Sequence, residues 1–240
     1  MTTIEQLQKI ISDSNNIVFF GGAGVSTESG IPDFRSVDGL YNQRYKYPPE
    51  FMLSHTFFAK HTIEFFDFYR EKMIFLNAQP NAAHYKLAEL EQKGKLKAVI
   101  TQNIDGLHQL AGSKTVIELH GSVRRNYCER CKTFFDEKFI LESSGVPTCS
   151  CGGVVKPDVV LYEESLNWDL MQKAVSYISK ADVLIVGGTS LVVYPAAGMI
   201  DYYHGNKLVL INRNSTSNDF RGNLLIQGSI GEVLGQISVL

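Results

Sequence analysis

The chain has 240 residues, of which 44% are hydrophobic and 20% are charged, and its formal net charge is −2. This length allows a large core, in one extended domain or in a large and a small one. The near balance of charge gives no broad field that would attract nucleic acid or a membrane surface. No apolar run approaches the roughly 20 residues that span a bilayer, and the N-terminus lacks the pattern of a secretory signal. We therefore expect a cytoplasmic protein without a direct nucleic-acid or membrane partner.

Apolar runs and helical periodicity alternate along the chain. Strands are predicted at 17–20, 98–101, 115–119, 183–187, 207–211 and 224–227, and helices near 4–12, 56–76, 82–92, 168–179 and 195–203. The helix at 82–92 has a start signal, because Asn81 supplies a capping side chain. Strands that alternate with helices favour an α/β fold with a Rossmann-like parallel sheet covered by helices on both faces.

Two segments break this alternation. Residues 36–75 are rich in aromatic side chains, and residues 122–155 contain the cysteines. We predict that both are insertions that pack together as a smaller lobe, which leaves 1–35, 76–121 and 156–240 to form the larger domain. The apolar segment 154–161 follows the cysteines, and it fits either a core strand or an exposed edge that pairs with a peptide.

The cysteines form two close pairs. They are Cys128 and Cys131, in a C-x-x-C pattern, and Cys149 and Cys151, in a C-x-C pattern. Two disulfides are the alternative, but a chain without an export signal disfavours them. Four thiolates around one Zn²⁺ close a small domain that buries little apolar surface, and no fifth candidate ligand interrupts the set. The spacing therefore predicts one structural zinc ion.

Small or polar residues follow five of the predicted strands. Because ligands bind at the carboxyl ends of the strands in a doubly wound sheet, these residues are expected to meet in one crevice. Any one of the clusters could be an ordinary strand-to-helix turn, but five together are harder to dismiss. They are Gly22, Ala23 and Gly24; Gln102, Asn103, Ile104 and Asp105; His120; Gly188, Thr189 and Ser190; and Asn212.

The first cluster resembles a nucleotide-phosphate turn, with Arg35 as a nearby cation. Alone it is a weak signal, since glycine turns are common and Thr27 stands where the G-x-G-x-x-G fingerprint needs its third glycine. No acidic residue lies about 20 residues further on, at the end of a second strand, to hold a ribose diol. An ordinary dehydrogenase is therefore disfavoured, and Asn212 becomes the candidate residue for binding the ribose.

Two further clusters have a structural alternative beside the functional one. A histidine is more often structural than catalytic, yet His120 ends a strand before a glycine, where imidazole can act as a general base. Residues 102–105 offer two amides and a carboxylate, suited to ribose hydroxyls and a carboxamide, but Asp105 could equally cap a helix. His84 and His108 lie in predicted helices and are interpreted as packing residues.

These motifs together resemble the sirtuin family, of the bacterial deacetylase type. The resemblance covers nearly the whole chain. It rests on 22–26 with 30–35, 101–108, His120 with Gly121, the four cysteines, 156–160, 188–191 with 193–195, and 211–212. It implies a Rossmann-like domain with a zinc-bearing lobe, and an NAD-dependent protein-lysine deacetylase that releases nicotinamide and O-acetyl-ADP-ribose.

The resemblance also implies roles for residues. The catalytic set would be His120 as general base with Asn103 and Asp105. The residues that contact NAD would be Gly22, Ala23, Gly24, Asp33, Phe34, Arg35, Gln102, Asn103, Ile104, Asp105, Gly188, Thr189, Ser190 and Asn212. Val159 and Val160 would pair with the backbone of a protein or peptide that carries acetyl-lysine. The cofactors would be NAD and one structural Zn²⁺, held by the four cysteines.

The acyl preference and the reaction have alternatives. Family members that prefer acidic acyl groups have a Tyr-x-x-Arg pair, and the comparable stretch here, 68–72, gives Tyr-x-x-Lys at best. A short apolar group such as acetyl is the first expectation, although Arg70 or Lys72 could still meet a carboxylate, as in a desuccinylase. The same NAD site could transfer ADP-ribose to a protein. A non-enzymatic zinc-ribbon adaptor is the least favoured hypothesis.

Overall fold

A computed structural model describes residues 1–34, 36, 39–42 and 45–239, so the predicted phosphate contact Arg35 lies outside the described residues. The larger sheet has six parallel strands in the order β3-β2-β1-β7-β8-β9. Their bounds are β1 Ile17–Gly21, β2 Leu96–Thr101, β3 Val116–Glu118, β7 Val183–Gly187, β8 Leu208–Asn212 and β9 Leu224–Gln227. The strand order reverses between β1 and β7, and ligands of α/β sheets bind at such a switch point.

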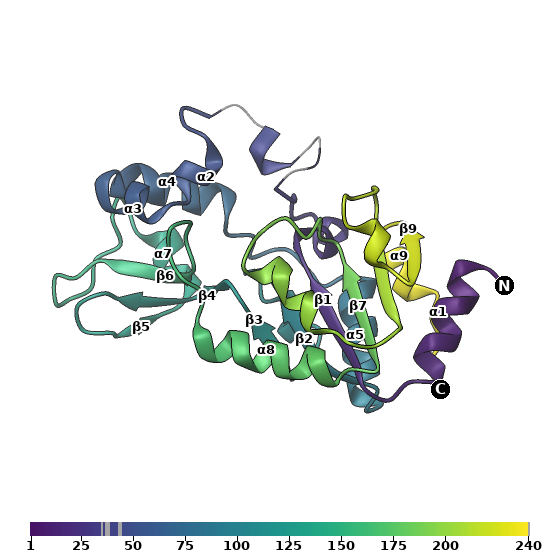
Figure 1. The fold of residues 1–240 in the computed structure, drawn as a ribbon. Coiled ribbons are helices and arrows are strands. Elements are labelled where there is room, and N and C mark those ends of the chain that lie inside the picture. Colours follow the sequence, from purple (N-terminus) through teal and green to yellow (C-terminus); the bar gives the residue numbers. More distant parts are fainter. Residues whose placement is uncertain (35, 37–38, 43–44, 240) are drawn as a thin grey trace.

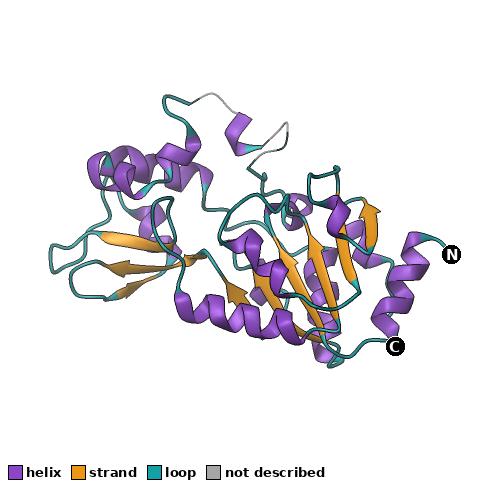
Figure 2. Ribbon diagram, viewed as in Figure 1, coloured by secondary structure: helices purple, strands orange, loops and turns teal. Residues whose placement is uncertain are grey.

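Helices cover both faces of this sheet, as Figure 2 shows. Successive side chains of a strand point to opposite faces. Accordingly, Phe19 packs in one core with helices α1 (Thr3–Ser12), α5 (Ala82–Gln92) and α9 (Ile230–Gly235). Phe20 packs on the other face with α8 (Trp168–Lys180) and with the 3₁₀ helix η4 (Ala196–Tyr202). The Rossmann-like sheet predicted from the sequence is confirmed.

A second sheet lies beside the first (Figure 1) and has three antiparallel strands in the order β5-β4-β6. These strands are β4 Gly121–Cys128, β5 Phe134–Phe135 and β6 Val155–Val159, and the accompanying helices are α2 Pro49–Met52, α3 His55–Lys60, α4 Thr62–Lys72 and α7 Glu137–Glu142. Aromatic side chains of α3 and α4 share one core with Cys128, Cys149 and Val155. The aromatic segment and the cysteine segment therefore pack together around one apolar cluster.

The predicted strands lie within two residues of the observed ones, but one predicted helix is wrong. The periodicity over 56–76 suggests a single helix, whereas the structure has α3 and α4 with a break at His61. His61 has φ −131° and ψ 47°, outside the helical region, and its ring stacks on Phe57 with 4.9 Å between centroids. Packing among the aromatic rings thus outweighs the local preference for one continuous helix. Segment 154–161, left open above, contains β6, an edge strand of the small sheet.

An arginine joins the two sheets. Arg125, on β4, donates from Nη1 to Glu118 on β3 at 2.7 Å and from Nε to Asp158 on β6 at 2.8 Å. Leu119 and His120 lie between β3 and β4, at the place where the chain passes from one sheet to the other. The bidentate use of one guanidinium fixes the relative position of the strands on either side of His120. Among the described residues, no helix is long and apolar enough to cross a membrane.

Candidate active site

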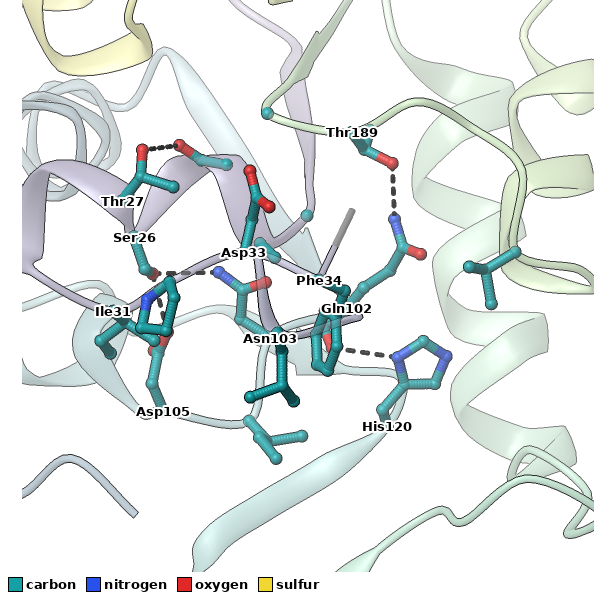
Figure 3. Close-up of a pocket in the computed structure, with 18 of the residues that line it drawn as sticks. Ser26, Thr27, Ile31, Asp33, Phe34, Gln102, Asn103, Asp105, His120 and Thr189 are labelled. Carbon is teal, nitrogen blue, oxygen red and sulfur yellow. Dashed lines mark hydrogen bonds between the residues drawn. The ribbon is translucent and has the colours of Figure 1, made fainter. Parts of the chain in front are cut away.

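A cleft of about 540 Å³ runs along the carboxyl ends of the parallel strands and reaches the small lobe. Strands of a sheet lie about 4.8 Å apart, so five spacings give the cleft a length of roughly 24 Å. That length suits a dinucleotide laid across the sheet. All the predicted NAD contacts that the structure describes line this cleft, and so do His120, Val159 and Val160. Figure 3 shows ten of the lining residues labelled.

The glycine turn after β1 packs closely against the turn after β7. A Cβ on Gly24 would lie 2.8 Å from the Cα of Gly188, and one on Gly188, whose φ is +62°, would lie 2.4 Å from the Val25 nitrogen. The amides of Gly22 and Gly24 donate to the carbonyls of Gly187 and Gly188. These two amides are therefore committed to the fold, which departs from the expectation that the turn's N–H groups face an anion. The bare backbone here allows β1 and β7 to meet at the middle of the cleft.

A chain of hydrogen bonds links the turn after β1 to the residues after β2. The Asn103 side chain donates from Nδ2 to Ser26 Oγ at 3.1 Å, and Ser26 Oγ donates to Asp105 Oδ2 at 2.7 Å. Asp105 Oδ1 also accepts from the Leu107 amide at 2.8 Å, but Gly106 is the N-cap of the short helix α6 (Leu107–Leu110), so Asp105 is not simply a helix cap. Ser26 is 1% exposed, and it fixes both functional side chains (Figure 3). Sequence reasoning missed its role because nothing in the turn shows which later residues will meet it.

A second chain of hydrogen bonds connects the ends of β2, β7 and β8. Gln102 donates from Nε2 to Thr189 Oγ1 at 3.2 Å. The Thr189 amide in turn donates to Asn212 Oδ1 at 3.0 Å. Three of the residues singled out from the sequence thus support one another. The side chains of the cleft are held before any ligand binds, which lowers the entropy cost of binding.

His120 has its protonation state defined by one contact. Its Nδ1 lies 2.9 Å from the backbone carbonyl of Gln102. A carbonyl oxygen can only accept, so Nδ1 donates and the neutral ring keeps its lone pair on Nε2. Burial lowers the pKa of His120, while the bond to Gln102 opposes that shift. At neutral pH the ring is therefore uncharged and can accept a proton at Nε2.

The end of the cleft next to the small lobe combines apolar side chains with the charged residues Lys72, Arg124, Glu163 and Glu164. Phe34, Ile104 and Leu161 are among the residues that line it, and Lys72 contributes the one lysine among the described lining residues. Lys72 pairs with Glu71 at 2.9 Å. Arg70 is occupied elsewhere, because its Nε donates to the Ile140 carbonyl at 2.9 Å and its Nη2 to the carbonyl of Gly145. This arrangement removes Arg70 as a partner for an acidic acyl group.

The four cysteines converge on one point of the small lobe. Their sulfur atoms all lie within 4.8 Å of one another, with 3.4 Å between Cys128 and Cys151 and 3.6 Å between Cys131 and Cys149. These separations exclude disulfides, whose S–S bond is about 2.05 Å. A tetrahedral zinc with Zn–S of about 2.3 Å places its sulfurs about 3.8 Å apart, so the set fits one Zn²⁺. Gly153 leaves the space, since a Cβ there would lie 2.6 Å from Cys128 Sγ.

Two buried histidines lie beneath the cleft and do not line it. The rings of His84 and His108 are 4.7 Å apart, and both residues are at most 1% exposed. Burial lowers the pKa of His84 to about 4, against a weaker opposing effect of Asp105. Burial also lowers the pKa of His108, and the neighbouring His84 lowers it further. Both rings are therefore neutral in the folded protein, which agrees with their interpretation as packing residues.

We predict that this histidine pair makes the protein sensitive to mild acid. The unfolded chain binds protons at the ordinary histidine pKa of about 6.5, whereas the folded chain resists them, so stability is complete above that pH and falls below it. Each histidine contributes a slope of up to about 1.4 kcal/mol per pH unit. Urea unfolding at pH 7.5, 6.5 and 5.5 should show the decline, and His108→Phe should flatten it relative to the exposed control His204→Ala. Equal slopes in the two variants would contradict the prediction.

The fold and the cleft together define a class of protein. A doubly wound sheet with a dinucleotide-sized cleft, a half-buried histidine with a free Nε2 and a four-cysteine lobe is typical of a nucleotide-dependent enzyme rather than a binding module. The Sir2 family model matches residues 22–195, and the chain belongs to the Sir2 family.

Known proteins resemble the chain over almost its whole length. An NAD-dependent protein deacetylase of Clostridium perfringens is 63% identical over 238 residues, covering 98% of both chains. A protein of the same name from Cutibacterium acnes is 53% identical and covers 98% of this chain and 97% of its own. Among solved structures, a Sir2 complex with a p53 peptide and NAD⁺ is 43% identical with a TM-score of 0.85, covering 98% of this chain and 96% of its own. A Sir2 variant with deacetylated p53 peptide and 3′-O-acetyl ADP ribose is 41% identical with a TM-score of 0.89, covering 97% and 96%.

Proposed function

We propose that the protein is an NAD-dependent protein-lysine deacetylase. The observation that carries this proposal is the convergence of His120, Asn103 and Asp105 on one cleft that also contains the glycine turn and Asn212. The names and ligands of the relatives described above support it. NAD would supply a glycosidic bond whose cleavage drives removal of the acetyl group; acetyl-lysine, NAD and one water would give free lysine, nicotinamide and O-acetyl-ADP-ribose.

In this proposal, the parts of the dinucleotide would be distributed among the ends of the strands. The ends of β2 and β3, with Asn103, Asp105 and His120, would hold the nicotinamide ribose and the carboxamide. The turns after β1 and β7 would face the pyrophosphate, and Asn212 after β8 would bind the adenosine ribose. His120 would take a proton from a ribose hydroxyl at Nε2, the ring atom that its bond to Gln102 leaves unprotonated. Phe34 and Ile104 would keep water from the reacting carbon.

The edge strand β6 would bind the peptide. One side of β6 pairs with β4, and β6 lies at the edge of its sheet. An extended peptide can add to such an edge through backbone hydrogen bonds. The Val160 amide donates to the His120 carbonyl at 3.0 Å, so the end of this strand is tied to the residue that performs the chemistry. Pairing at Val159 and Val160 would thereby deliver acetyl-lysine next to His120.

We also propose the division of the chain into two domains. Residues 1–35, 76–121 and 156–240 would form the NAD-binding domain, and the insertions 36–75 and 122–155 would form the small one. Two separate cores, one on the parallel sheet and one around the aromatic helices and cysteines, support this division. Strand β6 connects the two, because it pairs with β4 while its end reaches His120. A cytoplasmic location remains a prediction from the sequence.

The test is a peptide that carries acetyl-lysine, incubated with and without NAD. We expect deacetylation that requires NAD, with one nicotinamide and one O-acetyl-ADP-ribose formed per lysine freed. The same peptide with succinyl-lysine should react at least about tenfold more slowly, because Arg70 is turned away from the cleft and Lys72 is paired with Glu71. Label from NAD that remains on protein would instead indicate ADP-ribosyl transfer. Absence of any NAD-dependent product would contradict the proposal.

A further inference from the structure

The cleft extends beyond Asn212 to the ends of β8 and β9. Arg213, Asn214, Ser215 and Thr216 line it from one side, and Ser229 lines it from the other. Arg213 is exposed, and its Nη2 lies 3.5 Å from Ser229 Oγ. Its backbone carbonyl accepts from Gln227 Nε2 at 3.3 Å, which fixes the start of the loop after β8. A cation and several hydroxyl groups therefore surround this end of the cleft.

No carboxylate among the described residues that line the cleft follows β8 or β9. The acidic lining residues are Asp33 after β1, Asp105 after β2, and Glu163 and Glu164 after β6. Two other carboxylates lie near the adenosine end, and one of them, Asp219, lines an adjoining hollow with Asn212, Asn214 and Ser215. Asp219 accepts from the Thr216 amide and hydroxyl at 3.1 and 2.7 Å, and Glu28 accepts from the Gly231 amide at 2.7 Å.

This distribution of charge bears on which dinucleotide fits. In Rossmann-type sites an acidic residue bonds the 2′-hydroxyl of the adenosine ribose and repels a phosphate there, while an arginine accommodates a 2′-phosphate. The guanidinium is suited to phosphate because it donates two parallel hydrogen bonds and stays charged. Here Asn212 occupies the place proposed for the adenosine ribose. The next residue is Arg213, and the acid that lines the adjoining hollow, Asp219, is already engaged by the amide and the hydroxyl of Thr216.

We propose that the adenosine end of the cleft accepts a 2′-phosphate, so that NADP binds in competition with NAD. Arg213 would pair with the phosphate, and Ser229 would donate a hydroxyl to it. This inference rests on the proposed function, since it assumes that NAD lies in the cleft with its adenosine at β8 and β9. It adds a second ligand class, the 2′-phosphorylated dinucleotides, and therefore a sensitivity of the enzyme to the NADP pool.

The test compares the dissociation constants of NAD and NADP, measured by calorimetry on the full chain. The variants are Arg213→Gln and a control, Arg221→Gln, which removes the same charge from the same loop. Arg221 pairs with Asp201 and does not line the cleft. We expect NADP to bind the natural protein within about tenfold of NAD. Arg213→Gln should raise the ratio of the NADP to the NAD constant at least about fivefold, the effect of one lost charge-assisted pair, and Arg221→Gln should change it less than about twofold.

The outcomes separate this inference from the function on which it rests. If NAD binds and drives deacetylation but NADP binds more than tenfold more weakly, the inference is wrong and the function stands. A ratio that Arg213→Gln changes by less than fivefold, or by no more than the control does, also overturns the inference. If NAD itself fails to bind, the proposed function fails first.

Discussion

Replacing His120 with alanine should lower deacetylation by about 10²-fold or more, while NAD still binds with a similar dissociation constant. The imidazole is held by one bond to the Gln102 carbonyl, and its loss removes the base without disturbing the chains of hydrogen bonds at Asn103 and Thr189. Single-turnover assays with a labelled acetyl peptide would measure the rate. Calorimetry would measure the binding of NAD.

The same variant distinguishes a base from a structural histidine. The proposed base acts on a ribose hydroxyl after nicotinamide has left, so exchange of labelled nicotinamide into NAD should fall much less than deacetylation. His204→Ala, at an exposed histidine, is the matched control and should retain the natural rate. Unchanged turnover in the His120 variant would remove this residue from the mechanism.

The pH profile provides an independent check on the same residue. Burial lowers the pKa of His120, so the neutral, active ring persists below the ordinary histidine pKa of about 6.5. Activity that depends on this base should be constant above that value and should fall only as pH drops through the lowered pKa. The acid limb of kcat/KM should therefore lie below pH 6.5 and disappear from the residual activity of the alanine variant.

Replacing Cys128 with alanine should release the zinc and destabilise the small lobe. Cys128 is fully buried, and its sulfur belongs to the four-sulfur cluster while its side chain lies in the core of that lobe. Because metal binding contributes directly to the folding of small metal sites, we expect the melting temperature to fall by about 10 °C or more, the shift that roughly 3 to 5 kcal/mol gives in a chain of this size. Deacetylation should be lost with it, since β4 leads from this site to His120.

The zinc ligands can be counted chemically, because the cluster contains every cysteine of the chain. The chain has only four cysteines, all in the cluster, so a thiol reagent counts the ligands without background. The folded natural protein should hold one zinc per chain, and a chelator should expose four thiols. Ser150→Ala, between Cys149 and Cys151, is the matched control and should keep both zinc and stability. Folded, active protein without zinc would overturn the assignment of the metal.

Some elements were predictable because they depend on neighbours in the sequence. Strand β1 is a run of four apolar residues that ends at glycines, and α5 begins after a capping asparagine. The cysteine pairs likewise predicted one metal site. The helix predicted over 56–76 failed for the opposite reason: the break at His61 follows from ring packing with Phe57 and with Tyr47, which lies outside the predicted helix.

In the site, too, features that depend on neighbouring residues were predictable, and features that depend on distant segments were not. The meeting of the strands' polar ends follows from the α/β pattern, because parallel strands expose their carboxyl ends at one edge, whereas the order of the strands came only from the structure. Contacts between distant segments could not be predicted from the sequence. Ser26 bonds Asn103 and Asp105, which lie 77 and 79 residues further along the sequence, and Arg125 joins β3 to β6. No pattern within either segment identifies the other.

Residue types at short spacings were enough to predict the class of fold, the four-cysteine cluster and the side chains proposed to carry the chemistry. How those side chains are held became clear only from the folded chain. The tertiary structure committed the amides of Gly22 and Gly24 to the contact between β1 and β7, turned Arg70 away from the cleft, and placed the His120 lone pair on Nε2. These outcomes depend on close packing and hydrogen bonds between segments that the chain brings together only when it folds.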